Sequence, residues 1–224
     1  MNVPFSPPYI DDDLIKEVTD SLNSGWITTG PKVKHLEEEV GRLCGMKHVV
    51  AVNSATSGLM VALKWYGIGP GDEVIVPAYT YTATALAVYH LGAKPVIVDV
   101  KDDFTIDPVK VEQAINGNTK AIIPVDVAGW PADYGGIYKI LAKPNLKELF
   151  TPKTEEQKKL GRILVLSDAA HSIGAFYNGK PTGQLADITV FSFHAVKNVT
   201  TAEGGAVVLG LPKPFNEEEE YKKL

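Results

Sequence analysis

Lys197 and Asp168 are the two residues of this sequence whose types and surroundings best suit a defined chemistry. Lys197 lies in the segment 191–198, and Asp168 directly follows the apolar run 163–167. A lysine amine forms a Schiff base with an aldehyde, and a carboxylate beside a pyridine nitrogen keeps that nitrogen protonated. Pyridoxal phosphate needs both groups, so the pair predicts an enzyme that uses this cofactor. Each residue alone would be a surface charge or a helix cap.

A turn of small residues at 53–58 lies between a strand-like and a helix-like run. Free backbone N–H groups at the start of a helix, together with the helix dipole, attract a phosphate dianion. We therefore expect Ala55, Thr56 and Ser57 to bind the phosphate of the cofactor. The alternative is an ordinary helix cap at Ser54 or Thr56 without a ligand.

Three more side chains fit around a flat heteroaromatic ring. Tyr81 follows the strand-like run 73–76, where an aromatic side chain either stacks on such a ring or only packs in the core. His171 comes three residues after the aspartate and is either a cofactor contact or a structural histidine. Ser192 is expected to donate a hydrogen bond to the phosphate, and the amine of Lys197 to serve as general acid and base.

Length and composition exclude several classes of protein. The chain has 224 residues, of which 45% are hydrophobic and 22% charged, which suits one α/β domain with an appendage. Its net charge of −5 disfavours a nucleic-acid partner, and its single cysteine, Cys44, excludes internal disulfides and zinc-ribbon spacing. No apolar run approaches the ~20 residues that span a bilayer, and the first residues do not resemble a signal peptide. We expect no metal site, no membrane partner and a cytoplasmic location.

Short β-branched runs alternate with helical stretches from His48 onward. This alternation predicts an α/β fold with three layers, α/β/α, around a mainly parallel seven-stranded sheet, in which ligands gather at the carboxyl ends of the strands. Before it, two amphipathic helices are expected, one from Leu14 to about Gly25 and one over 33–43. The seven strands are expected at residues 49–52, 73–76, 95–98, 120–125, 163–167, 188–192 and 206–209.

The same pattern divides the chain into three parts. Residues 1–46 are an N-terminal helical segment, 47–210 the cofactor-binding large domain, and 211–224 the start of a truncated carboxyl-terminal region. Lys and Glu are dense over 141–161, which predicts a solvated insertion with one exposed helix.

Six ordered segments together resemble the DegT/DnrJ/EryC1/StrS family of sugar aminotransferases, a branch of the fold-type I, aspartate aminotransferase-like enzymes that use pyridoxal phosphate. The resemblance implies that Lys197 is the Schiff-base lysine, Asp168 the partner of the protonated ring nitrogen and Tyr81 the stacking aromatic. It also makes His171 a cofactor contact. The segments are 25–31, 53–57, 71–77, 168–171, 192–198 and 203–205.

The reaction implied by this family moves an amino group, typically from glutamate, to a keto carbon of a sugar linked to a nucleotide. Members act as homodimers, so a second copy of the chain is the expected partner. Substrate contacts are expected from Trp26, Thr28 and His194. The phosphate ligands that the resemblance implies are Thr56, Ser57 and Ser192.

The sequence departs from the family pattern in two places and leaves alternatives open. We expect the carboxyl-terminal small domain of the family to begin near or beyond Leu224 and thus to be missing from this sequence, and the segment 141–161 to be longer than the usual connection. A dehydratase of the same family would carry histidine in place of Lys197. A truncated, non-catalytic domain would bind pyridoxal phosphate without responding to glutamate. The last alternative is an α/β domain without a ligand. In that case the turn at 53–58, Tyr81, Asp168 and Lys197 would occur together by chance.

Overall fold

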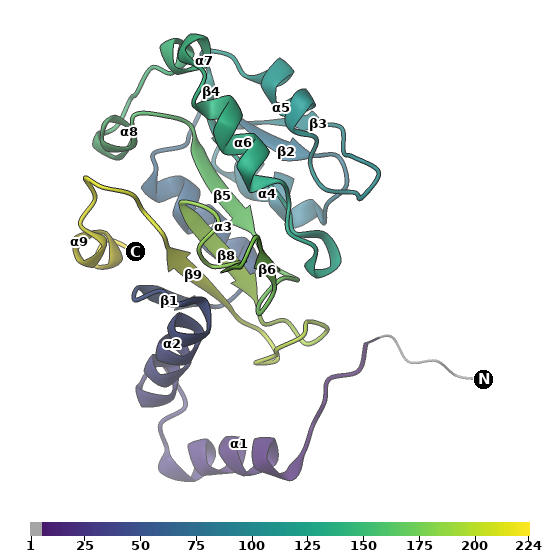
Figure 1. Cartoon of the computed structure of the whole chain (residues 1–224). Coiled ribbons are helices and arrows are strands. Elements are labelled where there is room, and N and C mark those ends of the chain that lie inside the picture. Colours follow the sequence, from purple (N-terminus) through teal and green to yellow (C-terminus); the bar gives the residue numbers. More distant parts are fainter. Residues whose placement is uncertain (1–5) are drawn as a thin grey trace.

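A seven-stranded sheet between layers of helices forms the body of the protein (Figure 1). The computed structural model describes residues 6–224. The strands of this sheet are β1 (Val49–Val52), β2 (Glu73–Pro77), β3 (Lys94–Val98), β4 (Thr119–Ile122), β5 (Leu164–Asp168), β8 (Ile188–Ser192) and β9 (Gly205–Leu209). Their order is β1-β9-β8-β5-β4-β2-β3, and β9 is antiparallel to both of its neighbours while the other six strands share one direction. The predicted α/β class and the mainly parallel seven-stranded sheet are confirmed.

Helices cover both faces of the sheet, which is why its strands are apolar on both sides. These helices are α2 (Pro31–Cys44), α3 (Ala55–Trp65), α4 (Thr82–His90), α5 (Pro108–Ala114) and α6 (Tyr134–Leu141). Helices α3 and α4 bury one face, toward which Val74 and Val76 of β2 point. Ile75, between them, joins the core cluster under α5 and α6 on the opposite face. Helix α2 covers the end of the sheet formed by β1 and β9.

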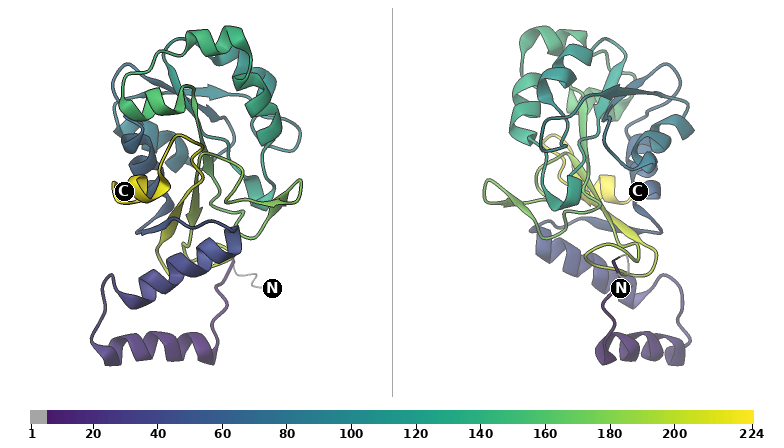
Figure 2. Two further views of the ribbon diagram at one scale, coloured as in Figure 1. Left: turned by 60° about the vertical axis from the view of Figure 1, so that its left-hand side comes forward. Right: turned by 90° about the vertical axis from the view of Figure 1, so that its right-hand side faces the viewer.

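Helix α1 (Asp12–Ser24) stands apart from the sheet, as Figure 1 and both views in Figure 2 show. The carboxylate of Asp11 caps its start by accepting a hydrogen bond from the N–H of Leu14 at 2.9 Å. Gly25 ends it with a φ of 71°, a conformation that glycine adopts without strain. The helix buries no residue, so its apolar face, which includes Ile15 and Val18, is exposed.

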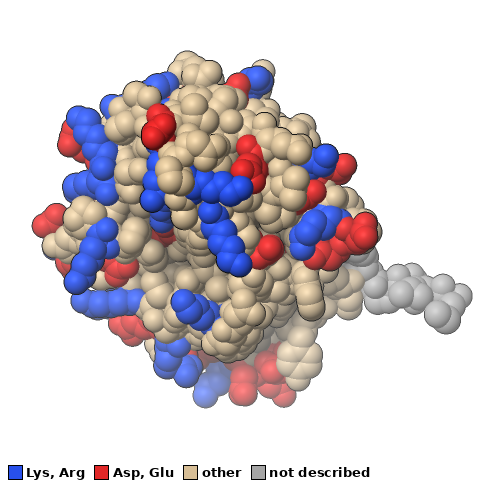
Figure 3. Space-filling model, turned by 45° about the horizontal axis from the view of Figure 1, so that its top comes forward, with Lys and Arg blue, Asp and Glu red and all other residues tan. Residues whose placement is uncertain are grey.

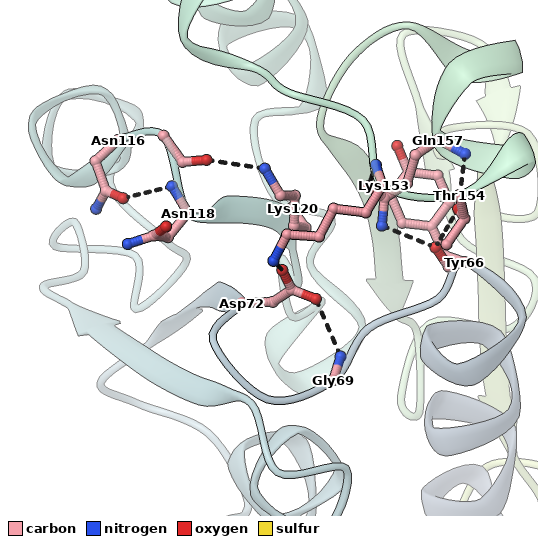
Figure 4. A network of polar contacts seen from close by, with 10 residues as sticks. Tyr66, Gly69, Asp72, Asn116, Asn118, Lys120, Lys153, Thr154 and Gln157 are labelled. Carbon is pink, nitrogen blue, oxygen red and sulfur yellow. Dashed lines mark hydrogen bonds and ion pairs between the residues drawn. The ribbon is translucent and has the colours of Figure 1, made fainter.

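The segment 141–161 differs from the expected solvated insertion with one exposed helix. It forms two short helices, α7 (Pro144–Leu149) and α8 (Glu155–Leu160), and buries Leu146 and Gln157. The amide nitrogen of Gln157 donates to the backbone carbonyl of Tyr66 at 3.0 Å (Figure 4). The high density of charged residues did not reveal this contact, because an uncharged side chain, Gln157, makes it.

An ion pair fixes the same segment to the start of β2 (Figure 4). Lys153 Nζ lies 2.5 Å from Oδ1 of Asp72, whose side chain is 3% exposed and whose other oxygen accepts the N–H of Gly69 at 3.1 Å. Lys120 lies nearby, fully buried, and donates to the carbonyl of Gly117 at 2.8 Å. Burial lowers the pKa of Lys120, while the nearby Asp72 opposes that shift.

Replacing Lys153 with alanine should lower the free energy of unfolding by about 1–2 kcal/mol, because the buried carboxylate of Asp72 loses its cation. Urea denaturation measures the change. The matched control is Lys158→Ala, which breaks a 2.6 Å pair with Glu155 on the surface, where the side chains are 57% and 74% exposed. That loss should cost less than about 0.5 kcal/mol. Equal changes in the free energy of unfolding would show that the Lys153–Asp72 pair stabilises the fold no more than the surface pair does.

Two smaller features complete the fold. A two-stranded hairpin of β6 (Phe176–Tyr177) and β7 (Lys180–Pro181), which the sequence did not predict, follows β5, and α9 (Glu217–Tyr221) ends the chain. On the face shown in Figure 3, Lys and Arg side chains are interspersed with Asp and Glu. Among residues 6–224, no helix has the length and apolarity needed to cross a membrane.

Candidate active site

A cavity of about 480 Å³ lies where β2, β4, β5 and β8 end, at the carboxyl edge of the sheet. Parallel sheets of this kind bind ligands at that edge, because the loops after several strands meet there. Eight of the residues singled out in the sequence line this cavity. They are Ala55, Thr56, Tyr81, Asp168, His171, Ser192, His194 and Lys197.

Lys197 and His171 form a close pair in the cavity. The Nζ atom of Lys197 lies 2.6 Å from Nε2 of His171. Burial lowers the pKa of Lys197, against the opposing charge of Asp168. Burial also lowers the pKa of His171, and the charge of Lys197 lowers it further. Both shifts favour the uncharged forms, and an uncharged lysine amine is the nucleophile that attacks an aldehyde.

Asp168 lies at the end of β5 with its carboxylate inside the cavity wall, and the residue is 7% exposed. Its Oδ2 accepts a hydrogen bond from the hydroxyl of Thr84 at 2.7 Å, and the hydroxyl of Thr80 lies 2.7 Å from that of Thr84. Its Oδ1 accepts the N–H of Ala170 at 3.3 Å. Burial raises the pKa of Asp168, so a cationic group placed beside it would be strongly stabilised.

The start of α3 forms another wall of the cavity. Ser54 caps this helix: its Oγ accepts the N–H of Ser57 at 3.2 Å and lies 3.0 Å from the Ser57 hydroxyl. The N–H groups of a first helical turn lack partners within the helix, so those of Ala55 and Thr56 suit an anion. A side chain at Gly205 would meet the N atom of Ala55 at 2.9 Å, so glycine permits β9 to approach this turn closely.

Tyr81, Ser192 and His194 lie on other sides of the cavity. Tyr81 precedes α4 and is 80% exposed, so its ring is free to lie over a ligand. The hydroxyl of Ser192 accepts the N–H of His194 at 3.4 Å. His194 Nε2 lies 3.5 Å from a carboxylate oxygen of Glu203. Glu203 also lines the cavity; it belongs to the segment 203–205 but was not among the expected site residues.

Trp26, Thr28 and Ser57 do not line this cavity. Trp26 and Thr28 lie in a separate hollow between α1 and α2, where the indole N–H of Trp26 donates to the carbonyl of Thr29 at 3.0 Å. Ser57 is turned toward Ser54. The structure therefore groups eight of the eleven expected site residues around one cavity.

Asp126 is the principal cavity residue that the sequence analysis missed. It is 1% exposed, and its carboxylate accepts hydrogen bonds from the hydroxyls of Ser172 and Tyr134 and from the N–H of Ala132. Burial, opposed by these bonds, raises its pKa from 3.8 to about 6, and the charge of Asp168 contributes to the rise. A signal was present in the sequence, because Asp126 follows an apolar strand just as Asp168 does.

The raised pKa of Asp126 predicts a pH-dependent stability. Because the folded chain binds this proton more tightly than the unfolded chain, the stabilisation is present below about pH 4 and is lost as the pH rises through about 6. In Asp126→Asn the side chain has no carboxyl group and does not titrate. Between pH 4 and 7 the free energy of unfolding of the unmodified chain should therefore fall by up to about 3 kcal/mol relative to the variant. Urea denaturation at several pH values measures the difference, and parallel curves would contradict the prediction.

The cavity meets the requirements of pyridoxal phosphate. A lysine amine and a buried carboxylate line the same space, a helix N-terminus is available for a phosphate, and Tyr81 is exposed beside them. Fold and site together define the class: the chain has the large-domain fold of pyridoxal phosphate-dependent aminotransferases.

Comparisons with known proteins identify the family. The sequence profile of the DegT/DnrJ/EryC1/StrS aminotransferase family matches residues 8–150 and 155–221, and the chain belongs to this family. The spore coat polysaccharide biosynthesis protein SpsC of Bacillus subtilis (strain 168) is 42% identical over 204 residues, which are 91% of this chain and 48% of SpsC.

Solved structures agree with this assignment. Spr1654 from Streptococcus pneumoniae, solved in a PLP form, is 47% identical, with a TM-score of 0.96 over 100% of this chain and 57% of that one. DesI, solved in the presence of its TDP-sugar product, is 32% identical, with a TM-score of 0.80 over 99% of this chain and 52% of that one. The chain thus spans about half the length of the relatives that it matches.

Proposed function

We propose that this chain is the cofactor-binding part of a pyridoxal phosphate-dependent aminotransferase that acts on a sugar. The observation that carries the proposal is the convergence of Lys197, His171 and Asp168 on one cavity beside the N-terminus of α3. Membership of an aminotransferase family supports it. Lys197 also argues against the dehydratase alternative, which would carry histidine at this position.

Different residues of the cavity would hold different parts of such a cofactor. Lys197 would supply the amine that attaches to the aldehyde and a group that can move a proton at the substrate carbon. Asp168 would face the ring nitrogen, and the hydroxyl of Thr84, which donates to its carboxylate, would orient it. Thr56 and Ser192, which line the cavity, would hold the phosphate, and Tyr81 would stack on the ring. Bound there, pyridoxal phosphate supplies an electron sink for the carbon that exchanges its amino group.

For the substrates, we propose a keto sugar linked to a nucleotide and glutamate as the amino donor. DesI, which was solved with a TDP-sugar product, and SpsC, a protein of polysaccharide biosynthesis, support a sugar substrate. His194, at the cavity wall beside Glu203, is the substrate contact that the geometry favours. Trp26 and Thr28 lie in the separate hollow between α1 and α2, so a role for them in substrate binding requires a neighbouring chain.

A second copy of the chain is the partner that we propose. Apolar side chains of α1, among them Ile15, Val18 and Leu22, are more than half exposed, which is typical of a surface that another chain covers. Light scattering of the purified protein after size exclusion should give twice the mass of one chain.

The function is tested by the absorbance of the purified chain with pyridoxal phosphate, before and after glutamate is added. An aminotransferase should convert the bound cofactor to its pyridoxamine form, and the visible band should fall. A band that forms but does not respond to glutamate would support a non-catalytic cofactor-binding domain. Absence of any bound band would overturn the proposal.

A further inference from the structure

We propose that Asp126 is a positioning residue that fixes the tautomer of His171 and thereby the proton that His171 presents to Lys197. The inference rests on the proposed function, because Lys197 and His171 matter only if they face a cofactor. The contacts that carry the inference connect four segments around the cavity.

The first contacts clamp the turn that follows β4. Oδ1 of Asp126 accepts the N–H of Ala132 at 3.0 Å and the hydroxyl of Tyr134 at 2.8 Å. The N–H of Asp126 donates to the carbonyl of Asp168 at 3.0 Å. The turn η1 (Val127–Gly129) lies between these anchored ends, so one buried carboxylate sets its position.

The clamped turn packs on His171. Ala128 has a φ of 51°, in the left-handed region that a residue with a side chain seldom adopts, and its N–H donates to Nδ1 of His171 at 3.3 Å. A side chain at Gly129 would lie 3.2 Å from the carbonyl oxygen of His171, so this part of the turn is in close contact too. The strained backbone is what points the Ala128 N–H at the ring, and it persists because its surroundings hold it.

The second carboxylate oxygen of Asp126 binds the residue next to His171. Oδ2 of Asp126 accepts the hydroxyl of Ser172 at 2.7 Å, and Ser172 directly follows the histidine. The N–H of Ser172 donates to the carbonyl of Ala169 at 3.0 Å. Asp126 therefore fixes both the backbone beside His171 and the turn that donates to its ring.

The chemical consequence follows from the donor at Nδ1. A neutral imidazole whose Nδ1 accepts a hydrogen bond carries its proton on Nε2. That Nε2 lies 2.6 Å from Nζ of Lys197, so the ring donates and the amine must accept with a free electron pair. An amine with a free pair is the form that attacks an aldehyde, so the proton placement maintained by Asp126 prepares Lys197 for cofactor attachment.

The direct test reads the His171 tautomer by ¹⁵N NMR of the imidazole in the cofactor-free protein above pH 8. The unmodified chain should show Nε2–H as the main form. Asp126→Ala should shift the tautomer ratio about tenfold toward Nδ1–H. Asp126→Asn keeps an acceptor for Ala132 and Tyr134, so its tautomer ratio should stay close to that of the unmodified chain. The rate at which borohydride-reducible pyridoxal phosphate is incorporated should follow the same order.

Asp133→Ala is the matched control. Asp133 also accepts a backbone N–H, from Gly136 at 2.9 Å, and a tyrosine hydroxyl, from Tyr177 at 2.8 Å, but it does not line the cavity. It should leave the His171 tautomer unchanged. If Asp126→Ala does not fold, Ser172→Ala removes only the contact to Oδ2 and should give a smaller shift in the same direction.

Two outcomes would overturn the inference. One is an unchanged tautomer in every folded variant that disrupts the Asp126 contacts. The other is a shift with Asp133→Ala as large as that with Asp126→Ala, which would indicate a general loosening of the loop. The tautomer is measured without cofactor, so these outcomes are distinct from failure of the proposed function. If only the proposed function fails, His171 should still carry its proton on Nε2, but pyridoxal phosphate should give no absorbance band with the chain.

Discussion

Replacing Lys197 with alanine should abolish the covalent adduct that borohydride fixes between this chain and pyridoxal phosphate. Lys197 is the lysine that lines the cavity, and burial lowers its pKa, which favours the uncharged amine that attacks an aldehyde. Intact-mass measurement after reduction should show one added cofactor on the unmodified chain and none on the variant. Because the loss is of a covalent bond, we expect it to be complete rather than partial.

A surface lysine provides the control for this substitution. Lys180 lies on the hairpin strand β7, is exposed and is not part of the cavity lining. Lys180→Ala should retain the full adduct, and peptide mapping should locate it on Lys197. An adduct of equal yield in Lys197→Ala, on any other lysine, would remove the basis of the proposed function.

The strand pattern was predictable from sequence because each strand is buried on both faces. Apolar runs such as 163–167 and 188–192 have few alternatives to a strand covered by helices on both sides. Asp168 was predictable for the same reason, since a carboxylate directly after such a run must lie at the carboxyl edge of the sheet. Local pattern thus predicts both the sheet and the groups attached to its strand ends.

Contacts between distant segments were not predictable in this way. Asp126 follows a strand as Asp168 does, but its hydrogen bonds to Tyr134 and Ser172 connect loops that only the folded chain brings together. The same holds for Gln157, whose bond to Tyr66 spans 91 positions and turns a charged segment into a packed one. Such pairings depend on three-dimensional position, which residue type and spacing leave open.

The segment 25–31, which contains Trp26 and Thr28, could not be placed relative to a substrate from the sequence. A motif that borders a substrate site in a whole family shows which residues take part, but it does not show on which chain they act. Trp26 and Thr28 line the hollow beside α1 and not the cavity that contains Lys197, and α1 stands apart from the sheet in Figures 1 and 2. If these residues meet a substrate, a second chain must bring its cavity to them, which joins substrate binding to the proposed dimer.

Replacing Asp168 with asparagine should weaken the binding of pyridoxal phosphate about 10- to 100-fold. The carboxylate is buried, and burial raises its pKa, so a protonated ring nitrogen placed beside it would stabilise the charged form. A hydrogen bond between charged groups in such surroundings contributes about 1.5–3 kcal/mol, which corresponds to that range of affinity. Asparagine keeps the size and the contact with Thr84 but removes the charge. Fluorescence titration measures the dissociation constants.

A cofactor analogue separates this charge effect from a change of shape. In an analogue whose ring nitrogen is replaced by C–H, no pyridinium forms, so Asp168→Asn should bind it as tightly as the unmodified chain does. Asp107→Asn is the control for the substitution itself, since Asp107 caps α5 and does not line the cavity. If Asp168→Asn weakens the analogue and pyridoxal phosphate equally, the carboxylate acts by shaping the cavity. An unequal effect instead shows that Asp168 acts through the ring nitrogen, because that atom is the single difference between the two ligands.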